Sequence, residues 1–198
     1  MTKYDVYGIG NAIVDKEFEV QDSFLAEHGI EKGMMTLVDR DQQVFILDQL
    51  IKTYGLKKRA GGGSAANSLY ALSQFGGKAF YSCRVANDET GDFFLEGLGQ
   101  HNIETNTNSQ RADGLSGRCL VMVTPDAERT MQTYLGVSDD ISISEMDFES
   151  AKQSKIMYLE GYLVTSDSAK SAIIEMKEYA IANNIKTAMT FSDPAMVE

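Results

Sequence analysis

A glycine-rich segment at the start of a predicted helix is the strongest candidate for a ligand site. Residues 61–67 read GGGSAAN. Glycines let a ligand approach the backbone, and the first turn of a helix offers unpaired N–H groups with a partial positive charge. The Asn67 amide can exchange hydrogen bonds with hydroxyl groups. The segment is typical either of a small-molecule site built on Gly62, Gly63, Ser64 and Asn67 or of a mobile turn with an ordinary helix N-cap at Ser64.

Two polar residues follow the first predicted strand. Asn11 and Asp15 lie four positions apart, and a carboxylate can accept two strong hydrogen bonds from a pair of neighbouring hydroxyls. Residues 11–20 alternate with a period of two, so Asp15 shares one face with Glu17 and Glu19. The alternative is therefore a solvated strand face, and the pattern alone leaves both interpretations open.

Arg129 is the candidate cation. It begins the second strand of a predicted hairpin, directly after the turn at residues 125–128. A guanidinium at this place can reach a substrate or a phosphoryl group, or it can pair with Asp126 or Glu128 in the turn. His28 and His101 have no partner at ligand spacing, so we predict no metal site.

The elements that would position these residues predict an α/β fold. Strand and helix patterns alternate, which indicates a mostly parallel sheet flanked by helices. The extended regions 11–38 and 113–135 break this rhythm, so we assign them to a small separate β-sheet, a lid. Residues 1–10, 39–112 and 136–198 are assigned to the α/β core. Because the sequence stops just after a predicted strand, we expect an incomplete domain.

A dinucleotide-binding fold is a weaker alternative, resting on Gly8-Ile9-Gly10. That motif requires a helix next and a third glycine three residues later. Position 13 is isoleucine, and residues 11–20 keep the two-residue period of a strand. An NAD-dependent oxidoreductase would need a helix at 11–20.

Composition narrows the class of protein. The 198 residues carry a net charge of −11 and are 43% hydrophobic, as in globular proteins. No apolar run approaches the ~20 residues that span a bilayer, and the N-terminus shows no signal peptide. An acidic chain is a poor nucleic-acid binder. We expect a cytoplasmic protein that binds neither nucleic acid nor membrane.

The order of the motifs resembles the ribokinase-like (PfkB-type) family of carbohydrate and nucleoside kinases. Three strings carry the resemblance: GIGNAIVD at 8–15, GGGSAANSLYALSQFGG at 61–77 and CRVANDETGDFF at 83–94. The stretch from Gly62 to Gly91 is similar to the first signature of that family. The resemblance covers essentially the whole chain, but only the N-terminal part of a family member.

The resemblance implies a central α/β sheet with a small β lid. It also implies transfer of the γ-phosphoryl group of ATP, with Mg²⁺, to a hydroxymethyl group of a nucleoside or sugar. The strings EGYLVTS at 160–166 and FSDP at 191–194 favour the adenosine-kinase-like branch. The substrate-binding residues implied by the resemblance are Asn11, Asp15, Gly62, Gly63, Ser64, Asn67 and Tyr162. Arg129 would stabilise the transferred phosphoryl group.

One part of the family pattern is absent. The second signature, Gly-Ala-Gly-Asp, which supplies the catalytic base, does not occur in the sequence, and neither does the Asn-x-x-Glu motif. We therefore expect the base downstream of Glu198, ATP bound mainly outside this chain, and no kinase activity from the 198 residues alone. A non-catalytic nucleoside- or sugar-binding protein is the alternative. A homodimer through the lid is also expected, with an apolar face made by Val14, Phe18, Met34, Leu120 and Met122.

Overall fold

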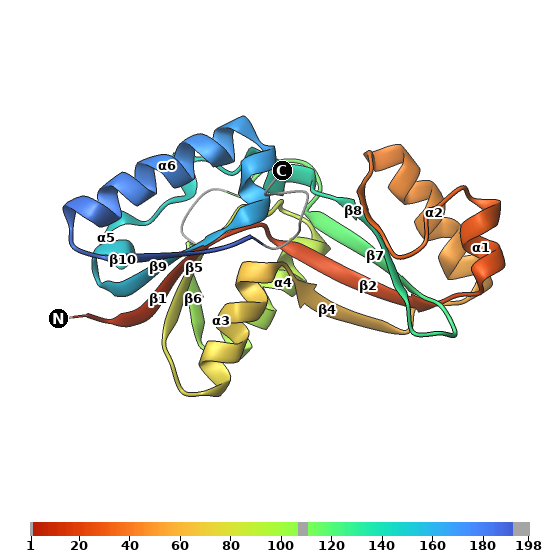
Figure 1. The fold of residues 1–198 in the computed structure, drawn as a ribbon, viewed down its shortest axis with the longest axis horizontal. Coiled ribbons are helices and arrows are strands. Elements are labelled where there is room, and N and C mark those ends of the chain that lie inside the picture. Colours follow the sequence, from red (N-terminus) through yellow and green to blue (C-terminus); the bar gives the residue numbers. More distant parts are fainter. Residues whose placement is uncertain (1, 107–110, 192–198) are drawn as a thin grey trace.

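The computed structural model describes residues 2–106 and 111–191. Two five-stranded sheets lie side by side, and helices cover them (Figure 1). Among the described residues, no helix is both long enough and apolar enough to cross a membrane. Most of the FSDP string, residues 192–194, lies outside the described part of the chain.

The first sheet is entirely parallel, in the order β10-β9-β1-β5-β6. Its strands are β1 (Tyr4–Ile9), β5 (Ala79–Ser82), β6 (Ile103–Thr105), β9 (Ser154–Glu160) and β10 (Lys186–Thr190). The helices α3 (Ser64–Gln74) and α4 (Glu89–Gln100) cover one face, and α5 (Phe148–Lys152) and α6 (Asp167–Ala182) cover the other (Figure 1). The predicted α/β class is confirmed.

The second sheet has the order β3-β8-β7-β2-β4. Its strands are β2 (Ile13–Glu19), β3 (Met35–Leu37), β4 (Lys58–Gly62), β7 (Gly117–Val123) and β8 (Arg129–Tyr134). The predicted hairpin is confirmed, because β7 and β8 pair antiparallel. Since residues 13–19 form a strand, the helix that a dinucleotide-binding fold needs at 11–20 does not exist, and that alternative is wrong.

Two elements differ from the predicted division of the chain. The segment 39–112 was assigned to the core sheet, but β4 within it pairs antiparallel with β2 of the second sheet. The helix α2 (Arg40–Thr53) also belongs there, because it buries Ile46 and Leu50 against Phe18 of that sheet. A short helix, α1 (Asp22–Glu27), joins this small core.

The expected dimer face is mostly buried inside the chain. Phe18, Leu120 and Met122 pack under α1 and α2, and Val14 packs in the core that α3 and α4 share. Of the five residues named for this face, only Met34 is exposed, at 50%. The apolar pattern was correct, but the chain itself supplies the covering helices, so this face is not available to a second copy.

Three single-turn 3₁₀ helices connect the last third of the chain: η1 (Gly136–Asp140), η2 (Ile143–Glu145) and η3 (Gly161–Thr165). Two of them hold residues that matter below. Ser138 of η1 is fully buried, and Tyr162 lies in η3, directly after β9.

Candidate functional site

A cavity of about 260 Å³ lies where the second sheet meets the carboxyl ends of β1 and β9 and the start of α3. In parallel sheets this edge is the usual place for ligands, because the loops that follow the strands converge there. The predicted residues that line it are Asn11, Asp15, Gly63, Ser64, Asn67, Arg129 and Tyr162. Residues from six elements or loops, far apart in the sequence, therefore face one space.

Gly62 lies next to this cavity and leaves room for one of its side chains. It is buried and does not line the space itself. A Cβ atom at Gly62 would overlap the Oδ1 atom of Asp15. The missing side chain therefore leaves the room that the Asp15 carboxylate occupies.

Asp15 presents a carboxylate that no described residue hydrogen-bonds. It points from β2 into the cavity, on the face opposite to the buried Val14 and Phe18. Burial raises its pKa to about 6, the positive charge of Arg129 lowers it, and the negative charge of Glu17 raises it. At neutral pH the group is mostly ionised, with its acceptor capacity unused.

The start of α3 differs from the predicted capping. Gly63, not Ser64, is the N-cap, with a positive φ of 93° that favours glycine, and a Cβ there would lie 2.8 Å from the Asn11 carbonyl oxygen. Ser64 is the first helical residue, and its Oγ donates a hydrogen bond of 2.6 Å to Glu160 Oε1. The Asn67 side chain faces the cavity and has no hydrogen-bond partner among the described residues.

Glu160 is the residue that sequence reasoning missed. It is fully buried at the end of β9, and it accepts hydrogen bonds from the backbone N–H of Asn11 (2.5 Å) and of Ala65 (3.0 Å) as well as from Ser64. Burial raises its pKa, whereas these hydrogen bonds lower it. Its position at the carboxyl end of a predicted parallel strand was the one available signal.

The carboxylate of Glu160 connects the turn after β1 to the start of α3. Gly10 makes room for it, because a Cβ there would lie 2.6 Å from Glu160 Oε2. Ser138 holds the other part of the same turn: its Oγ accepts from the Ala12 N–H (2.9 Å) and donates to Asn11 Oδ1 (3.2 Å). Asn11 is thus fixed and 3% exposed.

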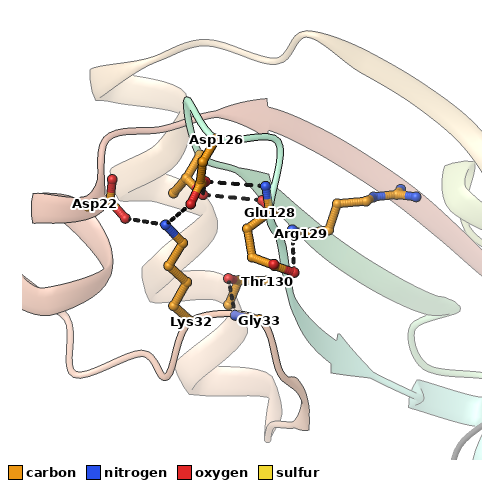
Figure 2. Close-up of polar contacts among 8 residues, drawn as sticks. Asp22, Lys32, Gly33, Asp126, Glu128, Arg129 and Thr130 are labelled. Carbon is orange, nitrogen blue, oxygen red and sulfur yellow. Dashed lines mark hydrogen bonds and ion pairs between the residues drawn. The ribbon is translucent and has the colours of Figure 1, made fainter.

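Arg129 does not pair within its turn. Figure 2 shows its side chain extending away from Asp126 and Glu128. Asp126 instead binds Lys32 Nζ at 2.7 Å, and Lys32 also contacts Asp22 at 2.6 Å. The Glu128 carboxylate accepts a hydrogen bond from the Arg129 backbone N–H, at 3.3 Å, and not from its guanidinium. The guanidinium lines the cavity without an ion pair to any described residue, so the turn-pairing alternative is wrong.

The opposite wall of the cavity is apolar. Its side chains come mainly from the second sheet, and they are Ile13, Met35, Leu37, Met131 and Leu135. Met35 and Met131 of this wall have flexible side chains that can adapt to the shape of a ligand. Together with Tyr162 they face a cavity whose other side carries Asp15, Asn67 and Arg129. Such a space suits a molecule with one polyhydroxylated end and one flat apolar end.

The residues present define which groups this cavity can hold. Its volume of about 260 Å³ is near the lower end for small-molecule sites. The cavity therefore has room for one molecule the size of a nucleoside or a sugar, and not for a nucleotide beside it. Among residues 2–106 and 111–191, no group of three or more His, Cys, Asp and Glu side chains could hold a metal ion.

Comparisons with known proteins bear on the family and the fold of the chain. The sequence pattern of the pfkB family carbohydrate kinases matches residues 32–197. The adenosine kinase of Saccharomyces cerevisiae is 24% identical over 194 residues, which cover 94% of this chain and 55% of the yeast protein.

Two solved structures share the fold over nearly the whole chain. The adenosine kinase from Sinorhizobium meliloti is 38% identical with a TM-score of 0.89, covering 98% of this chain and 58% of that one. A probable sugar kinase from Rhizobium etli is 32% identical with a TM-score of 0.91, covering 100% of this chain and 58% of that one. The chain spans about half the length of the curated relatives it matches.

Proposed function

The chain belongs to the pfkB family of carbohydrate kinases, and we propose that its cavity binds the phosphoryl acceptor of an ATP-dependent kinase reaction. The observation that carries the proposal is the convergence of three unpaired polar side chains in one cavity: Asp15, Asn67 and Arg129. They come from β2, α3 and β8, and no described residue hydrogen-bonds any of the three. Groups left unpaired in this way are available to a ligand.

Each polar residue has a distinct task in this proposal. The ionised Asp15 accepts hydrogen bonds from two neighbouring hydroxyls of the acceptor. Asn67 exchanges hydrogen bonds with a further hydroxyl. Asn11, held by Ser138 and Glu160, keeps the turn between β1 and β2 in place. Binding then fixes the orientation of the acceptor, which is a large part of catalysis in phosphoryl transfer.

The acceptor we propose is a nucleoside of the adenosine type. The apolar wall formed by Ile13, Met35 and Leu37, with Tyr162 nearby, would pack against a flat base, while the sugar hydroxyls meet Asp15. A free sugar would leave this apolar wall facing water. Similarity to a probable sugar kinase makes a sugar the alternative acceptor, and both are tested below.

ATP, with Mg²⁺, is the proposed phosphoryl donor. When bound, it supplies the phosphoryl group that is transferred to a hydroxymethyl group of the acceptor. Arg129 would stabilise negative charge on that group, because its guanidinium faces the cavity unpaired. The string Gly-Ala-Gly-Asp is absent from this sequence, so we propose that the 198-residue chain binds the acceptor without phosphorylating it.

Titration calorimetry tests the proposal. We expect adenosine to bind the 198-residue chain saturably and ribose to bind more weakly, because ribose lacks the base. Asp15→Asn should weaken adenosine binding about 100-fold. Glu17→Gln is the matched control, since Glu17 lies two residues along the same strand. The proposal would be overturned if Asp15→Asn bound adenosine as tightly as the native chain does. Circular dichroism of the variant shows whether it is folded.

A further inference from the structure

Three basic side chains gather on the face of the second sheet that points away from the cavity. In β2, Lys16 follows Asp15 and so points to the opposite side of the sheet. Lys16 lies directly opposite Arg59 of β4, and Val14 lies opposite Arg118 of β7. Since β4, β2 and β7 lie side by side (Figure 1), the three cations Lys16, Arg59 and Arg118 form one cluster, the rear cation cluster.

The cluster lies where two hydrophobic cores meet. On this face Val14 belongs to the core under α3 and α4, and Phe18 belongs to the core under α1 and α2. Lys16 stands between these two residues, so its stem is flanked by apolar surface. All three basic side chains are half-buried.

Few carboxylates are placed to neutralise the rear cation cluster. Glu89 pairs with Arg59 through both carboxylate oxygens, and the Arg59 guanidinium also lies 4.0 Å above the ring of Phe93. Lys16 and Arg118 form no ion pair with any described residue. Asp88, which acts on Arg118 electrostatically, is already engaged by the N–H and hydroxyl of Ser116.

Several nitrogen atoms of the cluster are buried without a partner. Within the described part of the chain, Arg118 Nε and Nη2 and Arg59 Nε make no hydrogen bond. Buried donors without a partner cost free energy. Burial, together with the neighbouring positive charges of Arg118 and Arg59, also lowers the pKa of Lys16. The arrangement is therefore unfavourable as it stands, in a chain whose net charge is −11.

We propose that the rear cation cluster binds a phosphate group, with Lys16 and Arg118 as its main ligands and Arg59 as flanking charge. A phosphate oxygen accepts several hydrogen bonds at once, and arginine presents paired N–H donors that match it. Binding would give Lys16 and Arg118 an anionic partner that no described residue provides, and it would relieve the repulsion among the three cations. The ligand is either inorganic phosphate or the phosphate of a small phosphomonoester.

This site is separate from the acceptor cavity. Asp15 and Cys119, which line the cavity, alternate along β2 and β7 with Lys16 and Arg118, which face the other side. Arg129, the cation of the cavity, is not part of the cluster. Mutations can therefore remove one site and leave the other.

A bound water is the competing explanation. The side-chain oxygens of Gln43 and Gln132 are also buried without a partner, and Gln43 donates to the Arg118 carbonyl oxygen at 2.8 Å. A water between these oxygens and Arg118 would satisfy the guanidinium without any anion. In that case phosphate would not bind.

Calorimetric titration of the 198-residue chain with inorganic phosphate, at constant ionic strength, decides between them. We expect saturable binding, weakened at least about tenfold in Lys16→Gln and in Arg118→Gln. Lys177→Gln, which removes one positive charge from the exposed side of α6, is the control and should bind phosphate as the native chain does. Arg129→Gln tests the acceptor cavity as the competing phosphate site, because Arg129 is the cation that lines it.

A second titration, with glycerol 3-phosphate, shows whether the bound phosphate group belongs to a phosphomonoester or is free phosphate. Tighter binding than inorganic phosphate, again dependent on Lys16, assigns a phosphomonoester; equal or weaker binding assigns free phosphate. Should Arg118→Gln fail to fold, Lys16→Gln decides alone. The proposal is overturned if the native chain shows no saturable phosphate binding. It is also overturned if phosphate binding is lost in Arg129→Gln and kept in Lys16→Gln. Adenosine titrations in parallel depend on Asp15 and so fail or succeed independently.

Discussion

Two carboxylates on the same cavity have opposite surroundings. Glu160 is fully buried and accepts hydrogen bonds from Ser64 and from the backbone of Asn11 and Ala65. Asp15, across the cavity on β2, accepts none from any described residue. Burial raises the pKa of both, but only Glu160 has donors that offset the cost of its charge.

The difference indicates that Glu160 stabilises the structure of the site, whereas Asp15 is available to bind a ligand. The donors of Glu160 come from segments that are 96 and 149 residues away in the sequence, so its charge holds the turn after β1 against the start of α3. The free oxygens of Asp15 leave its hydrogen-bonding capacity to a ligand. The four predictions that follow test this contrast, and the largest expected effect comes first.

Removal of the Glu160 side chain should chiefly affect stability. Glu160→Ala leaves donors of Asn11, Ser64 and Ala65 unpaired and creates a small cavity, so we expect the free energy of unfolding to fall by about 4 kcal/mol. Urea denaturation measures it. The control is Glu175→Ala on the exposed side of α6, which should change stability by less than about 0.5 kcal/mol. A similar small change for both variants would show that Glu160 does not hold the site together.

Removal of the Asp15 charge should chiefly affect binding. Asp15→Asn keeps the shape of the side chain, but we expect adenosine affinity to fall about 100-fold, or about 3 kcal/mol, because two charged hydrogen bonds are lost. Stability at neutral pH should stay equal or rise, since the variant no longer buries a charge. Calorimetry and urea denaturation on the same samples measure both. A loss of stability comparable to that of Glu160→Ala would erase the contrast.

Gly62 tests whether the room for the Asp15 carboxylate matters. A Cβ at this position would overlap Asp15 Oδ1, so Gly62→Ala should displace the carboxylate and weaken adenosine binding about tenfold. The matched control is Gly61→Ala, whose Cβ would lie 3.4 Å from the hydroxyl of Tyr70. Equal affinities in the two variants would mean that the carboxylate position is not critical.

The raised pKa of Asp15 predicts a pH dependence. With a folded-state pKa of about 6 against 3.8 for the ordinary group, adenosine affinity should fall almost tenfold between pH 7 and pH 5. The contribution of this group to folding stability has the opposite sign: it is present below about pH 4 and is lost as the pH rises through 6. Asp15→Asn should remove both components. Affinity that does not vary over this range contradicts the assignment.

The sequence predicted the local elements well, because strand and helix periodicities depend on near neighbours. The alternation around Asp15, the hairpin at Arg129 and the glycine turn at Gly63 were all visible in this way. The place of β4 was not, since its sequence KRAGG has no strand pattern and its pairing depends on β2. Glu160 was missed for a related reason: its role depends on three segments that meet only in the folded chain.

The rear cation cluster shows the same limit. Lys16, Arg59 and Arg118 are about 40 and 60 residues apart in the sequence, and only the strand register brings them to one face. In the sequence Arg59 ends the basic string Lys57-Lys58-Arg59, which by itself is typical of a solvated turn, yet its guanidinium lies over Phe93 and binds Glu89. Contacts between distant strands are therefore where the structure adds most to the sequence.

The central claim is that the Asp15 carboxylate binds the hydroxyls of the acceptor, and carbon-detected NMR of that carboxyl group tests it most directly. Titration of the free chain should give a pKa of about 6, and saturating adenosine should lower it, because hydroxyl donors stabilise the ionised form. A pKa of Asp15 that does not change when adenosine is bound would contradict the account.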